Sequence, residues 1–152
     1  MVRTGQLILI GIFLLSFSAA AHKVKIPGSI DELSVTRVAE NVYVLHGLIG
    51  MPDKNNKGFM SNASFIVSDT GVVIVDTGGS LKYGEYLVTK IREVTEKPVI
   101  AIFNTHMHGD HWLGNAALRK AFPDARIYAH EKAITRLKSG EAQQWLDSFA
   151  QA

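Results

Sequence analysis

The chain has 152 residues, which is enough for one domain of ordinary size, and its formal net charge is only +2. Apolar residues make up 47% and charged residues 20%, a balance typical of a globular protein rather than a disordered tail. Lys and Arg form no run or stripe, so we expect no nucleic-acid partner. The absence of cysteine excludes disulfides, thiolate catalysis and cysteine-based zinc sites, and leaves His, Asp and Glu as metal ligands.

Residues 1–21 have the features of a signal peptide. Arg3 gives a positive start, residues 7–17 are almost wholly apolar, and the alanines at 19–21 form an A-x-A cleavage site. An uncleaved membrane anchor is the alternative, but the apolar run is about half of the roughly 20 residues needed to span a bilayer. We therefore expect cleavage after Ala21, no stable membrane anchor afterwards, and a periplasmic or secreted domain formed by residues 22–152.

Short strands open the mature chain. Residues 22–33 are mixed in character and predict an irregular lead-in. Two β-branched runs follow at residues 35–39 and 42–45, and a turn at Glu40-Asn41 joins them. This pattern predicts a pair of neighbouring strands.

A long loop comes next, from Gly47 to Ser61. The stretch is rich in Gly, Asn, Lys and Pro and has no periodicity; a loop of about 15 residues is usually functional or mobile. It carries Met51, Phe59 and Met60. Two interpretations remain open: these side chains form an apolar flap over a pocket, or the loop tucks them inward.

A hairpin and a helix follow this loop. Residues 63–67 and 72–76 predict two strands, joined by a tight turn at Asp69-Thr70-Gly71. Residues 80–95 predict an amphipathic helix with Ser80 as its N-cap. Its apolar face is formed by residues three or four positions apart, namely Tyr83, Leu87, Ile91 and Val94.

Strands and helices alternate in the second half. The continuous apolar run at 99–103 predicts a strand covered on both faces, and residues 113–122 predict a helix that stops before Pro123. Residues 126–129 predict a short strand, and the remainder is expected to be helical. The packing positions expected in that remainder are Ile134, Leu137, Trp145, Leu146 and Phe149. This order predicts an α/β fold with a mixed sheet covered by helices.

Four potential metal ligands fall within six positions, directly after the strand at 99–103. They are His106, His108, Asp110 and His111. In extended backbone, residues two apart point to the same side, so His106 and His108 can direct two imidazoles at one ion. A turn at Gly109 would let the adjacent pair that follows reach a second ion. Unrelated surface histidines are the alternative, but the H-x-H-x-D-H pattern before a helix indicates a site for two divalent cations.

This segment resembles the signature of the metallo-β-lactamase superfamily, which includes glyoxalase II-type thioesterases, class B β-lactamases, lactonases and alkylsulfatases. The similarity covers roughly Val35 to His130 and includes the strand that ends in Asp76-Thr77-Gly78. The resemblance implies an αββα sandwich with its metals at one edge of two sheets. This chain would supply only the N-terminal half of that sandwich, as an incomplete domain.

The resemblance also implies roles for individual residues. His106 and His108 would bind a first zinc ion, and Asp110 and His111 a second. Asp110 would in addition act in catalysis by orienting the nucleophile. Asp76 would steady the metal-binding loop without binding a metal itself.

The family pattern is not complete in this chain. Members of the family normally add a third His, a bridging Asp and a last His further along the chain. After His111 only His130 follows, and it comes too early to be the third ligand, so we expect a structural or pocket-lining role for it. His22 and His46 have no motif around them. We therefore expect the chain to be a fragment of a longer protein.

The resulting hypothesis is a zinc-dependent hydrolase with two Zn²⁺ ions per complete domain. It would use a metal-activated water on an ester, thioester, lactone or β-lactam-type bond of a small-molecule substrate. Two alternatives stay open: an iron-binding redox protein on the same fold, and a truncated metal-binding protein without catalysis. The 152 residues alone are expected to be inactive, and the sequence indicates neither the particular substrate nor the oligomeric state.

Overall fold

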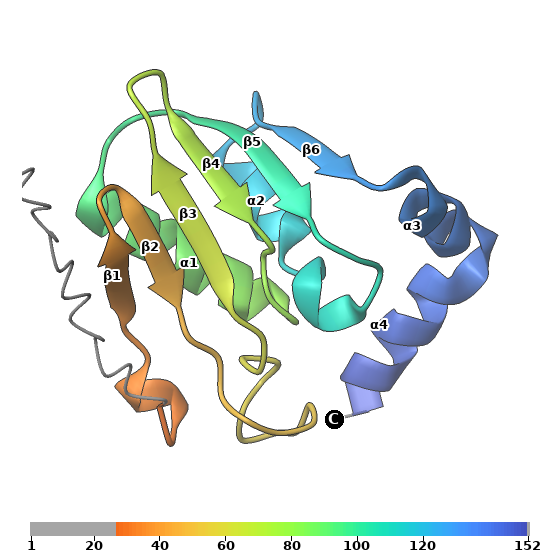
Figure 1. Ribbon diagram of the computed structural model, residues 1–152. Helices are drawn as coiled ribbons and strands as arrows, with labels where there is room; N and C mark the ends of the chain where they lie inside the picture. Colours follow the sequence, from red (N-terminus) through yellow and green to blue (C-terminus); the bar gives the residue numbers. More distant parts are fainter. Residues whose placement is uncertain (1–26, 152) are drawn as a thin grey trace, which may run out of the picture.

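The computed structural model describes residues 27–151, and within that range six strands form one sheet in chain order (Figure 1). The strands are β1 (Val35–Ala39), β2 (Val42–Leu45), β3 (Ala63–Val67), β4 (Val72–Val75), β5 (Val99–Asn104) and β6 (Arg126–Ala129). Strands β1 to β4 pair in antiparallel fashion, and β5 and β6 are added in parallel. The predicted mixed sheet is therefore confirmed.

The turns of the antiparallel half follow from their residues. Asn41, between β1 and β2, has φ 59°, a left-handed conformation that asparagine tolerates better than most residues. Between β3 and β4, the backbone N–H of Ser68 donates to the Gly71 carbonyl at 2.9 Å. Both predicted turns are confirmed.

Two helices, α1 (Leu81–Val94) and α2 (Asn115–Ala121), cover one face of the sheet (Figure 1). The Ser80 hydroxyl accepts a hydrogen bond from the Tyr83 N–H at 3.1 Å, which confirms the predicted N-cap. Tyr83, Leu87 and Ile91 are fully buried against the sheet. Burying an aliphatic side chain of this size contributes about 1.5–3 kcal/mol, so this apolar stripe fixes the helix on the sheet. Val94, at the end of the helix, is 37% exposed, so its predicted place on the buried face is wrong.

The opposite face of the sheet is exposed over its parallel half, so the prediction that residues 99–103 are covered on both faces is wrong for this chain. Ile100 and Phe103 of β5 are 40% and 44% exposed. Phe103 stacks on Tyr128 of β6, with ring centroids 5.0 Å apart. An apolar run predicts that a strand is apolar on both sides, but the described residues supply a helical layer on one side only.

The C-terminal segment is helical, as predicted, and returns toward the middle of the molecule. It consists of α3 (Glu131–Arg136), the helical turn η3 (Leu137–Glu141) and α4 (Ala142–Gln151). Of the expected packing positions, Trp145 and Phe149 are half-buried. Ile134 and Leu146 are 40% and 46% exposed, so they were assigned wrongly. None of the helices between residues 27 and 151 combines the length and apolarity of a membrane-spanning helix.

The segments before β3 are mostly irregular. The described part of the lead-in contains one 3-10 turn, η1 (Ile30–Glu32), and residues 47–61 form no regular element, as predicted. In this loop Phe59 is buried, whereas Met51 is 79% exposed. Inward packing is therefore right for Phe59 and wrong for Met51. The predicted signal peptide lies outside the described residues.

Candidate metal centre

The candidate site lies where β4 and β5 end. These strands are parallel, with Val75 opposite Phe103, so the residues that follow them emerge at the same edge of the sheet. Asp76 follows β4, and Thr105 and His106 follow β5. The chain then forms the 3-10 turn η2 (Gly109–His111), which carries the last two predicted ligands, before α2 begins.

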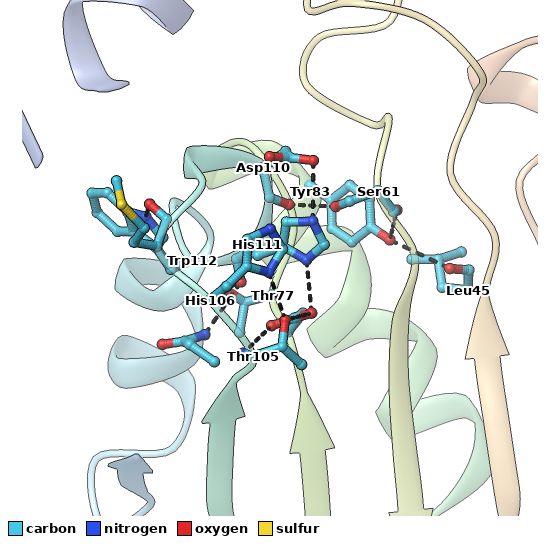
Figure 2. Close-up of polar contacts among 12 residues, drawn as sticks. Leu45, Ser61, Thr77, Tyr83, Thr105, His106, Asp110, His111 and Trp112 are labelled. Carbon is cyan, nitrogen blue, oxygen red and sulfur yellow. Dashed lines mark hydrogen bonds and ion pairs between the residues drawn. The ribbon is translucent and has the colours of Figure 1, made fainter. Parts of the chain in front are cut away.

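Asp76 is the acceptor at the centre of the hydrogen bonds of this edge. Figure 2 shows its neighbours Thr105, His106 and His111. Its Oδ1 accepts from the Thr105 backbone N–H at 2.8 Å, and its Oδ2 accepts from the Thr105 hydroxyl at 2.8 Å. The Nδ1 of His111 lies 2.7 Å from the same Oδ2. The Thr105 hydroxyl lies 3.0 Å from Nδ1 of His106. We call Asp76, Thr105, His106 and His111 the Asp76 network.

The Asp76 network determines which ring nitrogen of each histidine carries a proton. A carboxylate only accepts, so His111 must donate its Nδ1–H to Asp76. The Thr105 hydroxyl gives its one proton to Asp76, and therefore accepts from Nδ1–H of His106. In both rings Nε2 is left as the nitrogen that can bind a metal, the arrangement found where a carboxylate orients a ligating histidine.

The three histidine rings lie next to one another. The ring centroid of His106 is 4.7 Å from that of His108 and 4.1 Å from that of His111. Burial, followed by the neighbouring His111 and His108, lowers the pKa of His106 below its ordinary value. His106 is therefore held in the neutral form that a metal ligand requires.

Asp110 and His111 face each other across a short gap, with Oδ2 of Asp110 3.2 Å from Nε2 of His111. Burial lowers the pKa of His111, but its hydrogen bonds to Asp110 and Asp76 outweigh burial and raise it to about 9. The hydrogen bond from His111 holds the pKa of Asp110 below its ordinary value, against the effect of burial. At neutral pH His111 therefore carries a proton on Nε2 as well, in the gap between two of the predicted metal ligands.

A second set of polar contacts fixes the backbone of η2. The backbone N–H of Thr77 donates to the His111 carbonyl at 2.9 Å, and the Asn104 amide donates to the same carbonyl at 3.2 Å. The Asn115 amide donates to Oδ1 of Asn104 at 2.8 Å, and the Thr77 hydroxyl donates to Oδ1 of Asn115 at 2.9 Å. Sequence reasoning assigned no role to these three residues, because short polar side chains at strand and helix ends carry no distinctive spacing.

The long loop also reaches the site. The Ser61 hydroxyl donates to the Asp110 carbonyl, and the Tyr83 hydroxyl donates to the Ser61 carbonyl at 2.9 Å (Figure 2). A cavity of about 970 Å³ lies beside these groups, lined by Met60, Ser61, Asp110 and His111 among others. Part of the predicted loop therefore forms a wall of the candidate site.

The remaining histidines have separate places. His46 lines the same cavity, and within residues 27–151 its buried Nε2 has no hydrogen-bond partner. His130 is the N-cap of α3, where its Nδ1 accepts from the Lys132 N–H at 3.1 Å. His22 lies outside the described residues.

These residues have the chemistry of a metal centre but do not complete one. Imidazole and carboxylate ligands suit zinc, and a bound cation would replace the proton between Asp110 and His111. Among residues 27–151, no group of three or more His, Asp or Glu side chains is yet arranged to hold a metal ion. The site residues therefore fit the zinc ions that the family resemblance implies, while their role as ligands stays a prediction.

Comparison with known proteins shows what the chain is similar to. The family described as the metallo-beta-lactamase superfamily matches residues 56–149. A probable metallo-hydrolase of Streptococcus pyogenes serotype M6 is 35% identical over 78 residues, 51% of this chain and 32% of that protein. A hydroxyacylglutathione hydrolase of Acaryochloris marina is 34% identical over 82 residues, 52% of this chain and 30% of that protein. The chain thus spans about a third of the length of these relatives.

Solved structures agree with this fold. A metallo-beta-lactamase from Erythrobacter litoralis, crystallised with beta-mercaptoethanol in its active site, superposes with a TM-score of 0.57 and 30% sequence identity. The superposition covers 73% of this chain and 46% of that one. The six-stranded mixed sheet with its helices is therefore part of a known architecture.

Proposed function

Because the chain belongs to the metallo-β-lactamase superfamily, a superfamily of metal-dependent hydrolases, we propose that its protein is a zinc hydrolase whose metal centre is built on His106, His108, Asp110 and His111. The observation that carries the proposal is the Asp76 network. In this network Nδ1 of both His106 and His111 is used for hydrogen bonds. Nε2 of each ring is therefore free for a metal once an ion replaces the proton between Asp110 and His111. A structural histidine cluster would not require this arrangement of donors.

Each residue of the proposed metal centre has a separate role. Asp76 accepts hydrogen bonds from Thr105 and His111. It therefore keeps the loop after β5 in place when an ion replaces the proton between Asp110 and His111. His106 and His108 form one ligand pair, and Asp110 and His111 form the other. Zinc, when bound, lowers the pKa of water and offsets the negative charge that develops on the scissile group. Asp110, at the cavity wall, orients the attacking water and accepts its proton.

The proposed substrate is a small molecule with an ester, thioester, lactone or β-lactam-type bond. The 970 Å³ cavity beside Asp110 and His111 has the size of a small-molecule site. A hydroxyacylglutathione hydrolase among the relatives supports hydrolysis of a small substrate. The apolar segment at residues 7–17 supports export, so we propose that the protein acts in the periplasm or outside the cell.

Metal analysis and hydrolysis by one preparation test this function. The natural protein, with any residues that its gene adds to this chain, is purified, analysed for metals, stripped with a chelator and reloaded with zinc. We expect bound zinc, and hydrolysis that is lost on stripping and restored by zinc. Replacing both His106 and His108 with alanine should abolish activity, whereas the surface variant Gln143→Ala should retain it.

Two results would overturn the proposal. Full zinc-dependent activity of the double alanine variant would remove the metal assignment. Stoichiometric iron with a visible absorbance band would instead support the alternative of an iron-binding redox protein on the same fold.

A further inference from the structure

We propose that Trp145, on the C-terminal helix α4, is a positioning residue for the metal ligand His108; the inference rests on the zinc centre proposed above. The ring of Trp145 lies against the ring of His108, with centroids 5.0 Å apart and an interplanar angle of 45°. The two residues are 37 positions apart in the sequence, so their contact depends on how α4 folds back.

His108 needs such a contact more than the other two histidines do. His106 and His111 are both held by hydrogen bonds in the Asp76 network. Within residues 27–151, the His108 ring makes no hydrogen bond and is exposed to solvent. Its neighbours are the rings of His106 and Trp145, so an aromatic contact takes the place that a hydrogen bond has elsewhere in the site.

The backbone beneath α4 is built for a close approach. A Cβ atom at Gly109 would lie 3.2 Å from Cβ of Trp145 and 3.3 Å from a ring carbon of Phe149. A Cβ atom at Gly79 would lie 2.7 Å from another ring carbon of Phe149. We call these contacts of Trp145 and Phe149 with Gly79, His108 and Gly109 the α4 contact. Glycine at both positions lets the two aromatic rings reach η2.

The chain before α4 turns the helix toward this contact (Figure 1). Gly140 has φ 110°, a conformation that side chains rarely adopt, and it breaks the helical path between α3 and α4. Arg136 and Glu141 form an ion pair across the break, with two N–H donors each 2.7 Å from a carboxylate oxygen. A straight continuation of α3 would not bring Trp145 onto His108.

The consequence concerns metal binding. A ligand ring that is held in place loses less freedom when an ion binds, and removing a group that orients a ligand typically weakens metal affinity 10–100-fold. Trp145→Ala should therefore weaken Co²⁺ binding by about tenfold or more. Trp145→Phe keeps an aromatic ring and should restore most of that affinity. Leu146→Ala removes an apolar side chain from the exposed side of the same helix and should leave affinity unchanged.

The test is a Co²⁺ titration of the 152-residue chain and these three variants, followed through the visible absorbance of bound cobalt. A role in positioning predicts that Trp145→Ala changes the shape of the cobalt spectrum as well as the affinity, and that Trp145→Phe does not. A second measurement needs no change at position 145. In Trp112→Phe, Trp145 is the one remaining tryptophan, and its fluorescence should fall with the same midpoint as the absorbance rises.

The outcomes separate this inference from the proposed function. Cobalt binding with equal affinity and spectrum in wild type and Trp145→Ala, or binding without any response of Trp145 fluorescence, would overturn the role of Trp145 and leave the zinc proposal standing. No cobalt binding by the wild-type chain would overturn the role of Trp145, whereas the proposed function is decided separately by the metal content and zinc-dependent hydrolysis of the natural protein. Loss of affinity in Leu146→Ala equal to that in Trp145→Ala would show that α4 acts only through general stability, and would also overturn the inference.

Discussion

The two sides of the candidate metal centre are held by different forces. On one side, the Asp76 network places His106 and His111 through hydrogen bonds around a carboxylate whose side chain is 7% exposed. On the other side, the α4 contact places His108 through aromatic rings and close backbone approach. Hydrogen bonds fix direction as well as position, whereas ring contacts restrict position and leave direction freer.

This difference indicates how the site is assembled. The Asp76 network joins the ends of β4 and β5, which the sheet itself brings together. The α4 contact forms only if the C-terminal segment folds back at Gly140. The first side therefore depends on the core of the fold, and the second depends on a peripheral helix.

The largest expected effect comes from removing Asp76. Asp76→Ala removes the charged acceptor of three part-buried hydrogen bonds, which come from Nδ1 of His111, the Thr105 hydroxyl and the Thr105 N–H. At about 1–1.5 kcal/mol for each bond, we expect a loss of about 3–5 kcal/mol in the free energy of unfolding. Urea unfolding of the metal-free chain measures it. Asp76→Asn is the matched control, because asparagine tolerates the positive φ of 60° and keeps one acceptor oxygen. Equal midpoints for wild type and the alanine variant would show that the network does not stabilise the fold.

A pair of glycine substitutions compares the rigidity of the two sides. A Cβ atom at Gly114 would lie 2.0 Å from the Thr77 carbonyl oxygen, which is backbone, so Gly114→Ala should cost about 3 kcal/mol of stability. At Gly109 the nearest atoms belong to side chains at 3.1–3.3 Å, which can shift, so Gly109→Ala should cost about 1 kcal/mol. Thermal unfolding of both variants measures the difference. A Gly109→Ala loss as large as that of Gly114→Ala would mean that the α4 contact is as rigid as the core.

Thr105 allows the Asp76 network to be cut on one branch only. Thr105→Val replaces the hydroxyl that joins Asp76 to His106 and leaves the direct bond between Asp76 and His111 in place. We expect a stability loss of about 1 kcal/mol and metal binding about tenfold weaker. Thr105→Ser keeps the hydroxyl and should behave as wild type in the same Co²⁺ titration. If serine were as weak as valine, the hydroxyl alone would not account for the loss of affinity.

The same contrast explains what could be predicted from the sequence. The strands and α1 were predictable because β-branched runs and the spacing of Tyr83, Leu87 and Ile91 are local signals. The four proposed ligands were visible because they lie within six positions. Asp76 lies 35 residues from His111, and only the family resemblance pointed to it.

Other features could not be predicted because they depend on contacts between distant segments. Nothing near Trp145 indicates that its ring lies on His108, since that contact requires the break at Gly140 and glycines at 79 and 109. The exposure of Phe103 could not be predicted either, because an apolar run does not show how many layers cover a strand.

The smallest expected effect is the coupling between the two sides, measured by combining Thr105→Val with Trp145→Ala. In the metal-free chain the two side chains share no hydrogen-bond partner, so their effects on the free energy of unfolding should add within about 0.5 kcal/mol. In Co²⁺ binding the effects should not add, because His106 and His108 would bind the same ion, and misplacing either ring already weakens what the other can contribute. We therefore expect a coupling energy above about 0.5 kcal/mol in metal affinity and none in stability. This result would show that the Asp76 network and the α4 contact form independently and interact only through the bound ion. Full additivity in both measurements would mean that His106 and His108 do not share an ion, and strong coupling without metal would mean that the Asp76 network and the α4 contact are one structural unit.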